Sequence, residues 1–183
     1  MYKPISLLKN SPPNLDRIKV ERTTRINIRE ATQNDLDLIV QFTLSLHAHE
    51  DDGEITASEH FADNLSKWLL VEINNPQSLF LIAEKENSKK NDSAVGFIGA
   101  ASVINDNGFL TNPAKGLIQL LWVEEKSRKS KVAGNLVKEI EHCFKQVGIE
   151  YVECNYTCVN NLAEKFWDGL GYNKHSITAR KFI

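Results

Sequence analysis

The segment 115–148 constrains the fold most, because an apolar run there leads within a few residues into a long helix-forming stretch. The apolar run 115–123 is typical of a buried strand. The stretch 127–148 carries an apolar stripe and ends at Gly148, a residue type that commonly follows a helix. Four basic residues crowd the junction, where the exposed N–H groups and the macrodipole of a helix favour acidic ones. They are Lys126, Arg128, Lys129 and Lys131.

Each such cation costs about 0.3–1 kcal/mol at a helix start unless an anion lies nearby. A bound phosphate group would offset this cost, since the N–H groups at a helix start form a ready anion site. The alternative is a solvated basic patch, whose charges salt screens within about 10 Å. The basic cluster alone does not decide between these two interpretations.

The rest of the chain alternates between strand-like and helix-like patterns. The expected order is β-α-α-β-β-β-α-β-α-β, which indicates an α/β fold. A polar turn, 87–93, joins two of the strands into a hairpin. The expected strands are 25–30, 78–86, 94–104, 115–123, 149–157 and 175–183, and the expected helices are 34–50, 57–76, 127–148 and 160–172.

Length and composition favour one domain over residues 23–183, preceded by an arm of low order over residues 1–22 that holds three of the five prolines. The net charge of −2 gives no overall basic field for nucleic acid. No apolar run approaches the length of a membrane span or a signal peptide. The three cysteines lack paired spacing, which indicates free thiols and a reducing compartment. We therefore expect a cytoplasmic protein without membrane or nucleic-acid partners.

Two motifs resemble those of the GNAT superfamily of acyl-CoA-dependent N-acyltransferases. In that family a strand ending in valine is followed by [Q/R]-x-x-G-x-[G/A] at a helix start. Here Val123 precedes the run 128–133, in which Lys131 stands in place of the glycine. The second family motif, N-x-x-A-x-x-F-Y-x-x-x-G-[F/Y], is similar to the segment 160–172, with Trp167 in place of the tyrosine. One helix and one strand separate the two motifs, as in the family.

The resemblance covers about residues 25–183 and implies a mixed α/β fold, with a mostly antiparallel central sheet flanked by helices. It implies an N-acetyltransferase that moves an acetyl group from acetyl-CoA to a primary amine by direct transfer in a ternary complex, without a metal ion. We expect Lys131 to be tolerated, because helical backbone angles do not require glycine. The implied cofactor-binding residues are Trp122, Val123, Arg128, Lys129, Ser130, Lys131, Val132, Ala133, Asn160, Ala163, Phe166 and Trp167.

Two side chains with catalytic roles in members of the family are replaced. Gln119 stands where some members carry a glutamate, and an amide cannot act as a general base. Trp167 replaces a tyrosine that can protonate the leaving thiolate, and an indole N–H does not usefully give up its proton. Orienting the amine against the thioester can still supply about 7–11 kcal/mol. The resemblance also implies a backbone N–H near Val123 for the thioester carbonyl, and water can relay the amine's proton.

Tyr156 and Glu153 are the candidate catalytic substitutes. Both lie in the strand 149–157, beside the strand that ends at Val123. Alternation puts them on opposite faces, so at most one points into the site. The alternative function is a non-catalytic acyl-CoA-binding module that kept the fold and lost the chemistry.

Histidines and acidic residues gather between the first two predicted helices, in a segment that borders the acceptor site in the fold the chain resembles. They are His47, His49, Glu50, Asp51, Asp52 and Glu54, of which Glu50, Asp51 and Asp52 are the candidate acceptor-binding residues. They are either a solvated acidic loop or carboxylates that attract a cationic amine. The expected partner is a small-molecule or peptide amine, and a homodimer is one open oligomeric state.

Overall fold

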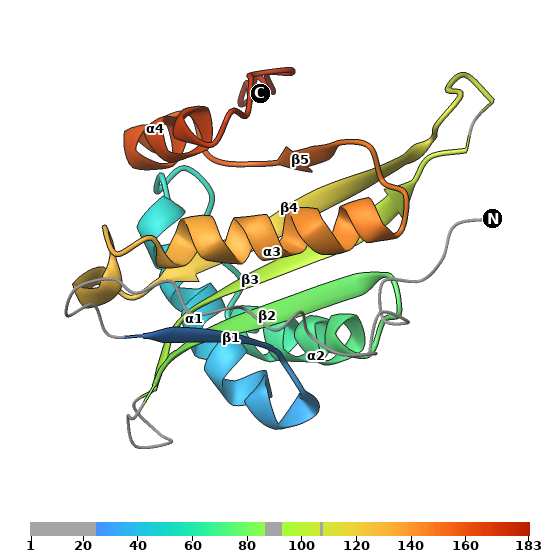
Figure 1. The fold of residues 1–183 in the computed structure, drawn as a ribbon. Helices are drawn as coiled ribbons and strands as arrows, with labels where there is room; N and C mark the ends of the chain where they lie inside the picture. Colours follow the sequence, from blue (N-terminus) through green and yellow to red (C-terminus); the bar gives the residue numbers. More distant parts are fainter. Residues whose placement is uncertain (1–24, 87–92, 107) are drawn as a thin grey trace.

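The computed structural model describes residues 25–86, 93–106 and 108–183. The predicted N-terminal arm, residues 1–22, lies outside the described residues, as does most of the predicted turn 87–93. The described chain forms one mixed sheet with helices on both faces (Figure 1).

The sheet has five strands within the described residues, in the order of the chain. They are β1 (Ile26–Glu30), β2 (Ser78–Lys85), β3 (Ala94–Ile104), β4 (Ala114–Val123) and β5 (Val152–Cys154). The first four pair in antiparallel fashion, and β5 runs parallel to β4. The prediction of a mostly antiparallel central sheet is confirmed.

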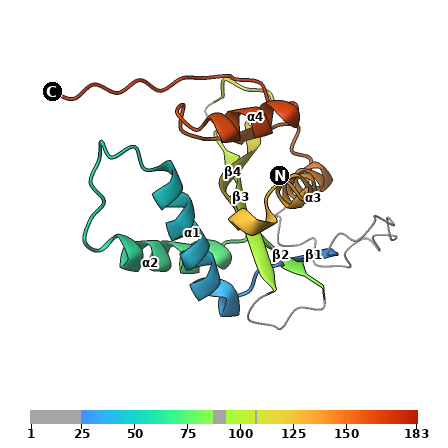
Figure 2. The ribbon, with the colours of Figure 1, turned by 90° about the vertical axis from the view of Figure 1, so that its left-hand side faces the viewer.

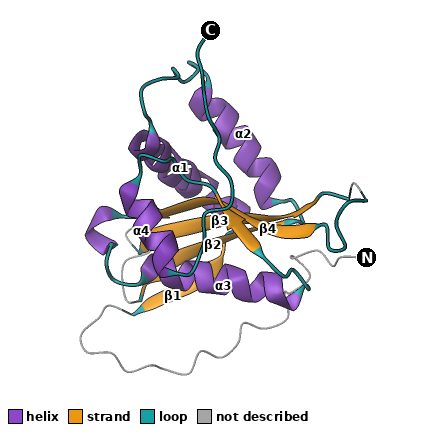
Figure 3. Ribbon diagram, turned by 90° about the horizontal axis from the view of Figure 1, so that it is seen from above, coloured by secondary structure: helices purple, strands orange, loops and turns teal. Residues whose placement is uncertain are grey.

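Helices cover both faces of this sheet. They are α1 (Leu36–Glu50), α2 (Phe61–Ile73), α3 (Val132–Gln146) and α4 (Asn161–Gly169), with short 3₁₀ turns η2 (Gln33–Asp35) and η3 (Glu125–Ser127). Figure 2 shows α1 and α2 on one side of the sheet and α3 on the other, and Figure 3 shows the same layers from above. In the described part of the chain, no helix combines the length and the apolar character needed to cross a membrane.

Side chains that alternate along β2 build two hydrophobic cores. Leu79 and Leu81 belong to the core that α3 covers, which also includes Trp167 from α4. Phe80 and Ile82 belong to the core that α1 and α2 cover. Because both faces are buried, β2 is a continuous apolar run without the polar alternation of a half-exposed strand.

The predicted last strand, 175–183, is wrong. The structure has no strand in this segment, and its side chains are exposed. The preceding strand is also shorter than predicted, because β5 hydrogen-bonds to β4 over three residues only. Arg180 in the tail instead contacts the loop between α1 and α2, where its Nη1 lies 3.2 Å from Asp52 Oδ2 and 2.8 Å from Glu54 Oε2. The order of the other elements agrees with the prediction.

A β-bulge in β4 marks the point at which β4 and β5 part. Gly99 pairs with Leu120 and Ala100 with Ile118, so Gln119 between them has no partner in β3. The parallel pairing of β4 with β5 also ends at Ile118. Beyond the bulge, β4 pairs with β3 along one edge, and within the described chain no strand pairs with its other edge.

Gly116 holds α3 against this part of the sheet, and its replacement by alanine should destabilise the protein. A Cβ at Gly116 would lie 2.5 Å from Cδ2 and from Cε2 of Phe144, a buried side chain of α3. We expect Gly116→Ala to lower the free energy of unfolding by about 1–3 kcal/mol, measured by urea denaturation, because the core would be overpacked.

Gly134→Ala, inside α3, is the matched control. Its Cβ would meet nothing nearer than Leu170 Cδ2 at 4.0 Å. Alanine favours a helix over glycine by about 0.8–1 kcal/mol, so this variant should gain stability. Equal stability of Gly116→Ala and the wild type would contradict the packing described.

Candidate functional site

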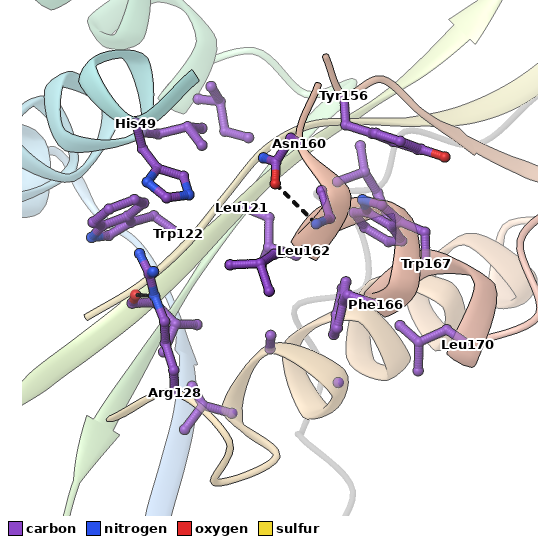
Figure 4. A pocket seen from close by; sticks show the side chains of 18 of the residues that line it. His49, Leu121, Trp122, Arg128, Tyr156, Asn160, Leu162, Phe166, Trp167 and Leu170 are labelled. Atoms are coloured by element: carbon purple, nitrogen blue, oxygen red, sulfur yellow. Dashed lines mark hydrogen bonds between the residues drawn. The ribbon is translucent and has the colours of Figure 1, made fainter. Parts of the chain in front are cut away.

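A cavity of about 650 Å³ lies where β4 and β5 part (Figure 4). One wall is β4 beyond the bulge, from Gln119 to Val123. The start of α3 and the loop before it form a second wall, and α4 forms a third. The last turn of α1 closes the cavity with Leu46, His49 and Glu50.

The predicted cofactor-binding residues come together around this cavity, with the exception of Ser130. Ser130 is exposed, and its hydroxyl donates a hydrogen bond to the carbonyl oxygen of Ser127. The predicted residues that line the cavity are Trp122, Val123, Arg128, Lys129, Lys131, Val132, Ala133, Asn160, Ala163, Phe166 and Trp167.

The start of α3 differs from the prediction. The helix begins at Val132, so the four basic residues lie before its first turn, in η3 and the following loop. Lys129 and Lys131 both adopt left-handed backbone conformations, with φ of 61° and 64°. The expectation that Lys131 would take helical angles is therefore wrong, and the left-handed region costs an L-residue about 1–2 kcal/mol.

The first turn of α3 presents unsatisfied N–H groups to the cavity. The first N–H of the helix with a backbone hydrogen bond is that of Asn135, which donates to the carbonyl oxygen of Lys131 at 2.9 Å. Among the residues that the structure describes, no side chain caps this helix, and its first turn holds no acidic residue. Val132, Ala133 and Gly134 line the cavity. The positive end of the helix dipole therefore lies at the cavity, where an anion would be stabilised.

Arg128 fixes the loop to the end of β4. Its guanidinium carbon lies 4.7 Å from the centre of the Trp122 ring, and its Nε donates a hydrogen bond to the Val123 carbonyl at 3.0 Å. Lys129, Lys131 and Lys138 also line this end of the cavity. Their positive charges add to that of the helix start.

The other end of the cavity is acidic and adjoins a second cavity of about 300 Å³. His49, Glu50, Asn160 and Leu162 line both cavities. Asn160 joins α4 to α1, because its Oδ1 accepts a hydrogen bond from the N–H of Ala163 at 3.0 Å and its Nδ2 donates to Glu50 Oε1 at 3.2 Å.

The predicted acceptor-binding residues are only partly brought together. Glu50 lines both cavities, and Asp51 lines the second. Asp52 lines neither and faces Arg180 instead. A hydrogen bond from the Glu54 N–H, and secondarily the charge of Arg180, hold the pKa of the Asp52 carboxyl below its usual value.

Of the two candidate catalytic residues, one lines the main cavity and the other does not, as expected from the alternation of side chains along a strand. Tyr156 lines the main cavity, near Trp167 (Figure 4). Glu153 does not, and it forms an ion pair with Lys115. Gln119, at the bulge, also lines the cavity.

Two other titratable groups near the cavity are held in their neutral forms. Burial raises the pKa of the Cys154 thiol to about 12, which disfavours a thiolate nucleophile. Tyr172 packs edge-on against Trp167, with ring centres 4.9 Å apart. Burial, and then its hydrogen bond to Glu141, raise the pKa of its phenol above the usual value. Tyr172 does not line the cavity and donates its hydroxyl hydrogen to Glu141, so it does not take the place of the missing tyrosine.

Leu46, Leu162 and Lys138 are among the lining residues that were not predicted from the sequence. A helical-face pattern could have indicated Leu46, because Phe42 in α1 is buried against the sheet and Leu46 follows one turn later on the same side. The same stripe continues through His49 and Glu50. Leu162 and Lys138 carry no local signal that separates them from other exposed helix residues.

Comparison with known proteins finds a protein family that matches most of the chain. The model of the acetyltransferase (GNAT) family matches residues 43–172 of the chain. No curated protein sequence matches the chain.

Solved structures share the fold at low sequence identity. A tetramutant of the BH1408 protein from Bacillus halodurans is 19% identical, with a TM-score of 0.75 over 86% of this chain and 99% of that one. A predicted acetyltransferase with acetyl-CoA from Clostridium acetobutylicum is 16% identical, with a TM-score of 0.70 over 86% and 96%. AAC(6')-Iy, in complex with the bisubstrate analog CoA-S-monomethyl-acetylneamine, is 17% identical, with a TM-score of 0.65 over 87% and 99%.

The left-handed conformation of Lys131 leads to a stability prediction. Lys131→Gly should remove a cost of about 1–2 kcal/mol, while the greater freedom of glycine in the unfolded chain takes back about 0.4–1 kcal/mol. We expect a net gain of about 0.5–1 kcal/mol in the free energy of unfolding, measured by denaturant titration without ligand.

Lys138→Gly is the control, because Lys138 lies within α3 in right-handed conformation. Glycine there should lower the free energy of unfolding by about 0.8–1 kcal/mol. A loss of stability in both variants would show that the loop does not hold Lys131 in the left-handed region.

Proposed function

Because the chain belongs to the acetyltransferase (GNAT) family and is an acetyltransferase, we propose that it moves an acetyl group from acetyl-CoA to a primary amine. The transfer is direct and takes place in a ternary complex. The observation that carries this proposal is a continuous cavity with basic residues at one end and a carboxylate at the other. The adjoining second cavity shares four lining residues with it and gives room for a second substrate.

In this proposal, CoA binds the protein mainly through its phosphate groups. The diphosphate binds the free N–H groups at the start of α3, and Lys129 and Lys131 add charge there. The rest of the cofactor extends along the edge of β4 that β5 leaves unpaired, toward α4. A backbone N–H near Val123 binds the thioester carbonyl, where it stabilises the negative charge that develops on attack. A solved relative in this fold is described with acetyl-CoA, which supports the choice of cofactor.

Tyr156 is the proton donor that we propose for the leaving thiolate. Its side chain lines the main cavity near Trp167, which occupies the family's tyrosine position. Glu153 is the weaker candidate, because its carboxylate is paired with Lys115 outside the cavity lining.

The acceptor amine approaches from the acidic end. Glu50 and Asp51 attract its positive charge. AAC(6')-Iy has been solved with a bisubstrate analog that joins CoA to a monomethyl-acetylneamine, which supports a small-molecule amine in this position. A cytoplasmic location, an arm of low order over residues 1–22 and a homodimer remain predictions from the sequence.

Ligand binding and turnover together test this function. CoA at about 100 times its Kd should stabilise the folded protein by about 2.7 kcal/mol, which raises the melting temperature. Acetyl-CoA should then be consumed in the presence of at least one amine from a panel of polyamines, amino acids and aminosugars. Binding without consumption would favour the non-catalytic module. No thermal shift at millimolar CoA, with the protein folded, would contradict the proposed cofactor.

Charge reversal at Lys131 tests where the phosphates lie. Lys131→Gly removes an attraction but opens the backbone to closer approach, so CoA affinity should change by less than about tenfold, or 1.4 kcal/mol. Lys131→Glu puts a like charge beside the phosphates and should weaken binding by more than about tenfold. Calorimetric titration at two salt concentrations measures both, and wild-type binding should weaken as salt rises.

Lys145→Glu is the matched control, because it makes the same change in net charge near the end of α3, on an exposed side chain away from the cavity. Its CoA affinity should stay within about twofold of the wild type. If Lys131→Glu binds CoA as well as this control does, the basic loop does not face the phosphates.

A further inference from the structure

The last turn of α1 places an imidazole where the two cavities meet. His49 lines the main cavity and the second cavity. Its ring lies edge-on to Trp122 of β4, with ring centres 5.8 Å apart and planes at 69°. Figure 4 shows the ring between α1 and Trp122, on the side of the cavity opposite α4. Trp122 is the neighbour of Val123, so the imidazole lies close to the proposed thioester position.

The Trp122 ring beside this imidazole is held in place by its own contacts. Arg128 lies over the Trp122 ring, and its hydrogen bond to the Val123 carbonyl anchors it to the end of β4. His49 is an exposed residue that makes no hydrogen bond or ion pair within the described residues. Its nitrogens are therefore open to a ligand that enters from either cavity.

The other candidate bases near the acceptor are already engaged or unsuitable. Glu50 Oε1 accepts the hydrogen bond from Asn160, which in turn caps α4. Asp51 lines the second cavity only, and its Oδ1 accepts a hydrogen bond from the Gly53 N–H at 2.9 Å. Gln119 is an amide and cannot take a proton.

We propose that His49 is the general base that takes the proton from the acceptor ammonium, an inference that rests on the proposed acetyl transfer. The neutral imidazole accepts one proton from R–NH₃⁺, which leaves R–NH₂ and an imidazolium. The nitrogen lone pair forms a bond to the thioester carbonyl carbon, and the C–S bond breaks with its electron pair on sulfur. The amide nitrogen then loses a second proton, which reaches the thiolate to give CoA–SH. The imidazolium releases its proton to water.

Charged groups of both signs lie around His49. Glu50 and Asp51 lie beside it on the same segment and line the second cavity with it. Arg128 lies on the Trp122 ring from the loop before α3. From α4, the residues that line the shared space are Asn160 and Leu162, which carry no charge. Tyr156 is the titratable group that faces the main cavity from beyond β5.

A matched pair of histidine variants tests the proposal. His47 lies two residues before His49 in α1, stacks on Phe61 with ring centres 4.4 Å apart and lines neither cavity. For the amine that the wild type acetylates best, His49→Gln should lower kcat by about 10²–10⁴-fold. His47→Gln should stay within about twofold of the wild type. His47→Gln should also leave CoA affinity unchanged, because His47 lines neither cavity.

The pH dependence of kcat separates a base from a merely structural side chain. The wild type should show an acidic limb within about pH 5–8, the range in which histidines change charge. His49→Gln should lose that limb, while His47→Gln and Glu50→Gln should keep it. The proposal is overturned if His49→Gln keeps both kcat and the limb, or if Glu50→Gln removes the limb instead. If the wild type acetylates no amine, the proposed function fails, and the role of His49 fails with it.

Discussion

Beyond Ile118, β4 keeps β3 as its hydrogen-bonding partner but loses β5, and the cavity depends on that one-sided pairing. The bulge at Gln119 lies at the same point. Buried backbone N–H and C=O groups require partners, so an extended ligand with amide groups suits the free edge of β4. The hydrophobic cores on both faces of the sheet hold β3 and β4 in place, so the gap beside the free edge of β4 stays open.

The loop before α3 supplies charge at a conformational cost. Lys129 and Lys131 occupy left-handed positions that glycine would occupy without strain. Strained backbone of this kind clusters at ligand sites, because the surroundings or a bound group hold it. Glu50 and Asp51 put the opposite charge at the far end. Because the two charges lie at opposite ends, the basic end suits a polyanion and the acidic end suits a cation.

Local patterns predicted most of the strands and helices, and the family resemblance supplied the residues expected to bind the cofactor. The junction at 115–148 was interpreted as a phosphate site from its charge together with the family motifs, and most of the residues named there line the cavity. The strand predicted at 175–183 does not form. A strand needs a free sheet edge in register, and Arg180 of this segment instead forms ion pairs with Asp52 and Glu54. The hydrogen bond from Asn160 to Glu50 joins residues 110 positions apart, which no local pattern indicates. The left-handed angle of Lys131 did have a signal, because the family motif carries a glycine at this position, but the lysine itself gives none.

Residue-resolved amide hydrogen exchange, with and without saturating CoA, tests the central claim that the cofactor occupies the parting of β4 and β5. The account predicts slower exchange at the start of α3, Val132–Gly134, and at those amides of Gln119–Val123 that β3 does not pair. Amides of α2, which lies on the other side of the sheet, should not change where they exchange by local opening. Slower exchange in α2 with no effect on β4 or on the start of α3 would contradict the account.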